Sequence, residues 1–287
     1  METVPALPFG GVYVNIGFIG AGRVGCSLGK YFIMRGFLVS GYYSRSEESA
    51  CLAAELTETV AFGSEEELIN NSDVIFLTVP DGMISPVWEN ISKLDLKNKT
   101  ICHCSGALSS GVFDGPEEMG RVSLHPLMAV STREHDLSRA FFTVEGNESG
   151  REKIEQILCK CGNPYQEIDA ASKVKYHAGA AVASNLVTGV LDMAIQMFMD
   201  CGFSEEKARE ALRPLVTGNA EAVMDMGAAK ALTGPVSRRD YETVEKHMKV
   251  LSGGELEIYR LLSLRLLDMT GDKNASEYMK VKGVLLK

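Results

Sequence analysis

A glycine-rich turn near the start of the chain constrains the fold more than any other feature. Residues 20–25 read Gly-Ala-Gly-Arg-Val-Gly, follow directly on the apolar run 14–19 and precede a helical pattern of apolar residues. A strand, a G-x-G-x-x-G turn and a helix in this order are typical of dinucleotide binding, because the helix start can hold a pyrophosphate. The alternative is a structural turn that binds nothing. The expected contact residues are Gly20, Ala21, Gly22, Arg23, Val24 and Gly25.

The end of the second expected strand distinguishes between two cofactors. Residues 38–43 have a strand pattern, and Ser44, Arg45 and Ser46 follow them. NAD sites have a carboxylate about 20 residues past the glycines, but no Asp or Glu occurs from the glycines to the end of this strand. An arginine between two hydroxyls can instead bind a phosphate through charge-assisted hydrogen bonds. The turn therefore predicts NADP, unless it is an ordinary polar connection.

Composition excludes several classes of protein. The chain has 287 residues, is 45% hydrophobic and has a formal net charge of −9. Its acidic balance gives no electrostatic basis for binding nucleic acid or an anionic membrane. Met1–Gly11 lacks the basic and apolar regions of a secretory signal, and no uninterrupted apolar stretch of ~18 residues predicts a membrane span. We therefore expect a cytoplasmic protein without nucleic-acid or membrane partners.

The cysteine pattern does not predict a metal site. Cys102 and Cys104 flank His103 in an expected strand, where neighbouring side chains point to opposite faces and cannot chelate one ion together. No second ligand pair with the usual zinc spacing is present. We expect the seven cysteines to be free thiols in a reducing compartment.

The alternation of elements predicts the fold class. Apolar runs bounded by turn residues alternate with helical patterns up to residue 168, and only helices are expected afterwards. This predicts an α/β Rossmann-type, mainly parallel sheet over residues 12–168, followed by an all-α domain over residues 169–287. The expected strands are 14–19, 38–43, 59–61, 73–79, 100–104, 122–125, 141–145 and 164–168. The expected C-terminal helices are 172–201, 204–226, 240–251 and 255–269, with a short tail after Asn274.

The carboxyl ends of the fourth and fifth strands should face the nicotinamide. Val79, Pro80 and Asp81 follow the fourth strand, and Ser105 follows the fifth. We expect these four residues to contact the cofactor, because ligands of such sheets bind at the carboxyl strand ends. For Asp81 the alternative is a helix cap. Since hydride transfer is the chemistry of the cofactor, the protein must position the substrate and supply a proton donor.

The start of the long expected helix carries the strongest catalytic candidates. Lys173, His177, Ala181 and Asn185 follow one another at intervals of four and form one slowly drifting row. A cation, a titratable ring and an amide among small residues resemble a cavity wall. We predict His177, Lys173 and Asn185 to be catalytic. The alternatives are a solvated lysine, a satisfied interface histidine and an asparagine that bonds another helix.

Four further residues are predicted to bind the substrate. Thr233 and Arg238 flank a Gly-Pro break between helices and could reach an anionic group, although this segment also suits a capped turn. His125 ends the sixth strand, where it could instead hold the strand end together, and Ser105 lies at the same edge.

Seven segments occur in an order that resembles one bacterial family: GFIGAGRVG, YYSRS, FLTVPD, HCSGALSS, SLHPLMA, KYHAGAAVASN and LTGPVSRRD. Together they are similar to Rossmann-like proteins with a C-terminal domain of unknown function. These belong with NADP oxidoreductases related to pyrroline-5-carboxylate reductase and deazaflavin-dependent reductase. The resemblance implies an N-terminal NADP-binding domain, an α-helical second domain and a homodimer formed through the C-terminal helices.

The chain also resembles a wider group of dehydrogenases, but it differs from their sequence pattern at one position. β-Hydroxyacid dehydrogenases have Ser-Gly after the fifth strand, as at Ser105-Gly106, and a helix with Lys-x-x-x-Asn, where this chain has Lys173 and His177. We therefore predict an NADP-dependent oxidoreductase that transfers hydride to or from a small carbonyl, imine or hydroxy-acid substrate. The alternatives are a non-catalytic NADP(H)-responsive binding protein and an enzyme with a flavin or deazaflavin as second cofactor.

Overall fold

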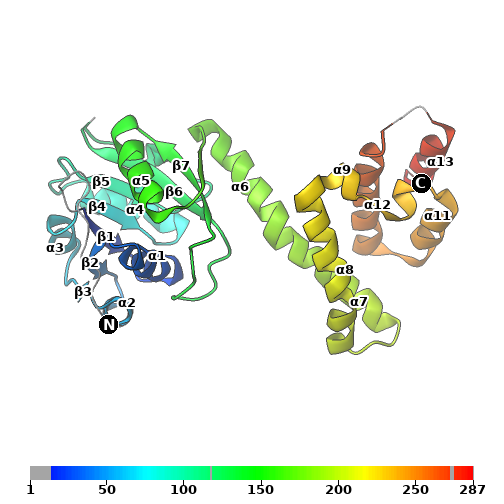
Figure 1. The fold of residues 1–287 in the computed structure, drawn as a ribbon, viewed down its shortest axis with the longest axis horizontal. Helices are drawn as coiled ribbons and strands as arrows, with labels where there is room; N and C mark the ends of the chain where they lie inside the picture. The colour runs from blue at the N-terminus through cyan, green and yellow to red at the C-terminus, as the bar shows by residue number, and fades with distance from the viewer. Residues whose placement is uncertain (1–13, 117, 272–274, 287) are drawn as a thin grey trace. The chain divides into compact units, whose positions relative to one another are not determined.

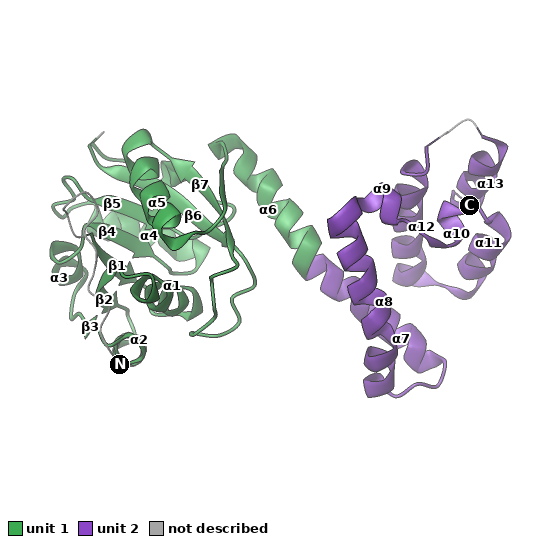
Figure 2. Ribbon diagram, in the orientation of Figure 1, with its two compact units in different colours: residues 1–184 green, residues 185–287 purple. Residues whose placement is uncertain are grey.

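The computed structural model describes three stretches of the chain, residues 14–116, 118–271 and 275–286. The expectation for Met1–Gly11 lies outside the described residues. The chain forms two compact units, residues 1–184 and 185–287 (Figure 2). The sequence places the domain boundary at 168/169, where the strand pattern ends. The first unit extends further because the start of the long helix packs on it, with Lys173 only 1% exposed.

An eight-stranded sheet forms the centre of the first unit, in the order β3-β2-β1-β4-β5-β6-β7-β8. Neighbouring strands are parallel except for the antiparallel pair β6 and β7. The strands are β1 (Asn15–Ile19), β2 (Leu38–Tyr43), β3 (Val60–Ala61), β4 (Val74–Leu77), β5 (Thr100–His103), β6 (Gly120–Leu127), β7 (Phe141–Gly146) and β8 (Tyr165–Glu167). The predicted fold class and its eight strands are confirmed. Because β1 lies between β2 and β4, the strand order reverses there, where such sheets bind ligands.

Two apolar cores cover opposite faces of the sheet, whose strands and surrounding helices are labelled in Figure 1. Along β4, Val74 and Phe76 belong to one core, whereas Ile75 and Leu77 belong to the other. Strand side chains alternate between faces, so a strand covered on both sides has a continuous apolar run. Helices α1, α2 and α5 cover the first face, and α3 and α4 cover the second. Their bounds are α1 (Arg23–Met34), α2 (Glu47–Thr57), α3 (Glu65–Asn70), α4 (Asp81–Ile91) and α5 (Glu148–Cys161).

The long helix predicted for residues 172–201 contains one irregular turn. It runs through α6 (Lys173–Ala181), a π-helical turn (Val182–Leu186) and α7 (Val187–Asp200). Bonds in a π turn join residues five apart rather than four. Asn185 lies in this turn, so it does not continue the row of Lys173 and His177. The predicted row assumed an uninterrupted α-helix and is corrected here.

Among the described residues, one helix is long and apolar enough to cross a membrane, residues 170–200, with a mean hydropathy of 1.5 in its most apolar window. The sequence expectation differed because it considered only uninterrupted apolar runs, whereas this window tolerates polar residues. An apolar helix of this kind is also found where protein packs on all its sides. Its first turn does pack on the sheet through the buried Lys173.

The second unit is helical in all its described residues outside the turns, which agrees with the predicted all-α domain. One difference is helix α13, where only a short tail after Asn274 was predicted. Tyr278, Val281 and Leu285 recur at helical spacing and are buried in one core with Val244. The helices after α7 are α8 (Glu205–Met226), α9 (Ala228–Ala231), α10 (Gly234–Ser237), α11 (Tyr241–Val250), α12 (Gly253–Asp268) and α13 (Ser276–Leu285).

Candidate active site

The three glycines of the turn have different structural roles. Gly20 has a φ of +111°, and a Cβ on it would lie 2.7 Å from the carbonyl oxygen of Thr78. A Cβ on Gly25 would lie 2.5 Å from the Gly20 carbonyl oxygen, so this glycine lets α1 pack against the turn. A Cβ on Gly22 would meet nothing within 4 Å. Gly22 therefore leaves open space beside the first N–H groups of α1, as close approach of a pyrophosphate requires.

A cavity of about 520 Å³ joins this turn to the ends of β2 and β4. Its charged lining side chains are Arg45, Glu65 and Arg133. Burial raises the pKa of the Glu65 carboxyl. Two arginines and one carboxyl give the cavity an excess of positive charge. The predicted cofactor residues that line it are Gly20, Ala21, Gly22, Ser44, Arg45, Val79 and Pro80.

The other predicted cofactor residues have structural partners. The hydroxyl of Ser46 accepts a hydrogen bond from the Ser49 N–H at 3.2 Å and caps α2. The guanidinium of Arg23 donates to the carbonyl oxygen of Ser131 at 3.4 Å. Val24 packs against the first core. Ser46 therefore caps α2, and its contact with the cofactor stays a prediction.

Arg133 is a cavity residue that the sequence did not reveal. It lies in the loop between β6 and β7 and lines the cavity together with Gly20, Ala21 and Gly22. No motif or periodic pattern surrounds it in the sequence. Only the tertiary path of the loop brings it to the glycine turn.

The loop after β5 is organised by the hydroxyl of Ser105. This hydroxyl donates to Asp81 Oδ2 at 2.6 Å and accepts from the N–H groups of Ala107 and Leu108 at 3.2 and 3.0 Å. Its hydrogen bonds are thus used within the protein, and it holds the start of α4 to the loop. Asp81 is the first residue of α4, and Pro80 occupies the cap position before it. In this geometry Ser105 positions the loop, and its predicted contacts with cofactor and substrate stay predictions.

Lys173 is buried in the first unit rather than solvated. Its ammonium donates to the carbonyl oxygen of Ser105 at 3.1 Å and to the hydroxyl of Ser123. Burial lowers the pKa of Lys173, and the charge of Glu145 opposes that change. Glu145 is 7% exposed and accepts from the backbone N–H and the hydroxyl of Ser110. Lys173 therefore fastens the start of α6 to the loop after β5.

Two histidines approach this loop at Gly106. A Cβ on Gly106 would lie 2.6 Å from Nδ1 of His177 and 3.0 Å from Nε2 of His125, so glycine leaves room for both rings. The ring centroids are 6.1 Å apart. His125 Nδ1 is also 2.7 Å from the hydroxyl oxygen of Tyr176, a partner that the sequence did not suggest. His177 is exposed. The structure thus brings the predicted residues His125, Lys173 and His177 to one loop.

Burial lowers the pKa of two histidines at this edge to about 4. For His125, the charges of Lys173 and His177 add to the effect of burial. For His103, burial dominates, while a hydrogen bond with the carbonyl oxygen of Ser109 opposes it. His103 Nδ1 accepts from the Ser105 N–H at 3.2 Å, so this ring is a structural part of the loop. No group of three or more potential metal ligands is found in the part of the chain that the structure describes.

The lowered pKa values of His103 and His125 predict that the free energy of unfolding falls in mild acid. Between pH ~6.5, where histidine titrates in an unfolded chain, and pH about 4 the unfolded chain binds more protons than the folded one. Stability must therefore rise with pH across this window, by at most ~1.4 kcal/mol per pH unit for each histidine. Urea unfolding at pH 7 and pH 5 measures this slope. His103→Gln should reduce the slope, and an unchanged slope would contradict the assignment.

Asn185, Thr233 and Arg238 belong to the second unit. Thr233 and Arg238 flank the short helix α10, and both are exposed. The turn that follows is capped by Asp240, whose carboxylate accepts from the Thr243 N–H at 3.1 Å and from its hydroxyl at 2.7 Å. The capped-turn alternative is therefore realised, and roles of these three residues in the site stay predictions.

Two protein-family models match the chain. Residues 15–105 match the NADP oxidoreductases described as coenzyme F420-dependent, and residues 140–266 match a domain of unknown function, DUF2520. Residues 15–105 are thus similar to an oxidoreductase family that uses NADP, and residues 140–266 are similar to DUF2520. The predicted resemblance is confirmed.

Individual relatives agree with this assignment. The chain is 25% identical over 155 residues to a Bacillus subtilis protein named "Putative 6-phosphogluconate dehydrogenase YqeC", and it spans about half the length of this curated relative (50% of each chain). The crystal structure of protein TM1727 from Thermotoga maritima has a TM-score of 0.73 and 26% identity, over 91% of this chain and 100% of that one. Plasmodium falciparum pyrroline carboxylate reductase, solved with NADP bound, shares the fold at a TM-score of 0.58 and 18% identity, over 94% and 98%.

Proposed function

We propose that this protein is an NADP-dependent oxidoreductase that transfers hydride to or from a small carbonyl, imine or hydroxy-acid substrate. The observation that carries the proposal is the cavity that joins the open Gly22 backbone to Arg45. Gly22 would approach the pyrophosphate, and Arg45 would bind the 2′-phosphate. Bound NADPH supplies the hydride. The match of residues 15–105 to an NADP oxidoreductase family supports the same reading.

The chain's own groups would serve the reaction at the loop after β5. Pro80 lines the cavity and precedes Asp81, which the Ser105 hydroxyl holds to this loop. His125 and His177 approach the loop at Gly106. We propose that His177 donates or accepts the substrate proton, while Lys173 keeps the loop in place. The second candidate acceptor is a deazaflavin, which the description of the matched family favours.

Arg45→Ala tests the cofactor. Removing a guanidinium that binds the 2′-phosphate should weaken NADPH by roughly 10- to 100-fold, because a hydrogen bond to a charged group contributes ~1.5–3 kcal/mol. NADH lacks that phosphate and should bind as it does to the wild type. Calorimetric titration of both proteins with both nucleotides measures the difference. An equal loss for the two nucleotides, or none, would argue against NADP recognition at Arg45.

We further propose a cytoplasmic homodimer formed through the C-terminal helices. Large apolar side chains are exposed in the second unit, including Leu186 (60%), Leu215 (68%) and Met224 (81%). Apolar patches of this kind are usually covered by another protein surface, and closed two-fold pairs are the commonest arrangement. Sedimentation equilibrium should give twice the chain mass of 31.2 kDa. The mass of a single chain would reject the dimer.

A further inference from the structure

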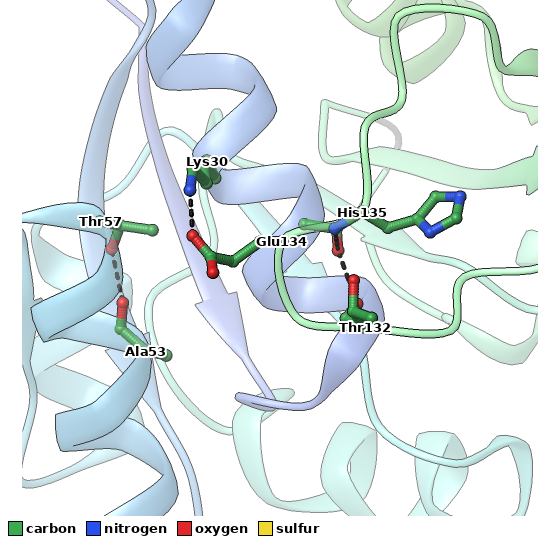
Figure 3. Close-up of polar contacts among 7 residues, drawn as sticks. Lys30, Ala53, Thr57, Thr132, Glu134 and His135 are labelled. Carbon is green, nitrogen blue, oxygen red and sulfur yellow. Dashed lines mark hydrogen bonds and ion pairs between the residues drawn. The ribbon is translucent and has the colours of Figure 1, made fainter.

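The loop between β6 and β7 is fastened along α1 over residues 131–135, and we call residues 128–139 the strap. The Ser27 hydroxyl donates to the carbonyl oxygen of Thr132 and accepts from the His135 N–H, both at 3.1 Å. Lys30 forms an ion pair with Glu134 (Figure 3). The strap is therefore held to the helix on both sides of Arg133.

The far end of the strap is fixed in the core. Leu137 is fully buried. The side-chain amide of Asn163 donates to the carbonyl oxygens of Leu137 and Ala140, both at 3.0 Å. A loop with buried apolar contacts and satisfied backbone groups keeps one path. These contacts limit the region that the Arg133 side chain can reach.

The tertiary path of the strap places Arg133 at the glycine turn. It lines the cavity together with Gly20, Ala21 and Gly22. Its charge also reaches the first turn of α1: burial raises the pKa of the Cys26 thiol, and Arg133 opposes that rise. Arg133 thus lines the cavity wall together with the glycine turn that precedes α1. Arg45 stands at the end of β2, on the other side of the sheet's switch point.

We infer that the strap is a second arm of the dinucleotide site and that Arg133 binds the pyrophosphate. This inference rests on the proposed NADP function. A helix start contributes only partial charges, whereas a pyrophosphate carries full ones. An arginine offers paired donors that match phosphate oxygens. The two arginines then bind different phosphates. Arg133 binds the pyrophosphate, which NADPH and NADH share, and Arg45 binds the 2′-phosphate, which only NADPH has.

Titration of Arg133→Ala with NADPH and NADH tests the inference. Both nucleotides should bind more weakly by a similar factor, roughly 10- to 100-fold. Arg139→Ala is the matched control, because it removes the same charge from an exposed position of the strap that does not line the cavity. It should bind both nucleotides as the wild type does. Thermal unfolding of each variant without nucleotide checks that the fold is intact.

Ser27→Ala tests the strap itself. It removes both hydrogen bonds that flank Arg133 and keeps the arginine. Binding of both nucleotides should fall several-fold, because the strap beside Arg133 is then held only by the Lys30–Glu134 ion pair and by its far end in the core.

The outcomes separate the two proposals. If the wild type binds neither nucleotide, the proposed function and this inference both fall. If the wild type binds but Arg133→Ala is unaffected, or loses only NADPH, the proposed function stands and the pyrophosphate role of Arg133 is rejected.

Discussion

Replacing His177 with alanine should lower turnover by roughly 10²- to 10⁴-fold, the usual contribution of a general acid or base, while NADPH binds with wild-type affinity. The structure provides two imidazoles at Gly106, and their environments differ. Burial lowers the pKa of His125 to about 4, so that ring is neutral near pH 7 and is a poor proton donor. His177 is exposed and can exchange protons with solvent. His177 is therefore the stronger candidate for proton transfer.

His177→Asn is the matched variant for this prediction. Asparagine keeps hydrogen-bonding ability but cannot transfer a proton at neutral pH. It also restores the Lys-x-x-x-Asn spacing of the wider dehydrogenase group. If His177 acts as acid or base, the asparagine variant should be as impaired as the alanine variant, with calorimetric NADPH binding unchanged in both. Recovery of turnover by asparagine would show that this position only orients the substrate.

The parts of the site that could be predicted from the sequence lie in local motifs. The glycine turn and the Ser44–Ser46 turn each lie on one short segment whose conformation follows from neighbouring residues. The central strands could be predicted because both faces of the sheet are covered there, which makes a strand such as β4 a continuous apolar run.

The parts that escaped prediction depend on distant pairings. Arg133 reaches the cavity because its strap bonds Ser27, 108 positions away from His135 in the chain. Tyr176 meets His125 across 51 positions. The π turn at Asn185 breaks a helical row that a regular period would continue. None of these follows from the spacing of residues within one segment.

Lys173→Met should lower the free energy of unfolding of the first unit by ~3 kcal/mol. The ammonium is buried, and Glu145 makes the largest electrostatic contribution that keeps it charged. Methionine fills similar space but removes the donor of the hydrogen bonds to the Ser105 carbonyl oxygen and the Ser123 hydroxyl, and a buried polar group left without its partner costs ~1–3 kcal/mol. The estimate is at the upper end because the favourable charge of Lys173 on Glu145 is lost as well. Urea unfolding of the two proteins at pH 7 measures the change.

Glu145→Gln and the double variant Lys173→Met/Glu145→Gln complete a double-mutant cycle. If the two charges stabilise each other, the double variant should be more stable than the sum of the single losses predicts, by ~0.5–3 kcal/mol. Additive losses would mean that Lys173 acts through Ser105 and Ser123 alone.

Turnover of the double variant then separates two roles of Lys173. A stable double variant that still turns over identifies Lys173 as a positioning residue of the loop, because such a role needs the fold but not the charge. A stable but inactive one shows that the reaction itself needs the ammonium, as the Lys-x-x-x-His spacing on α6 first suggested.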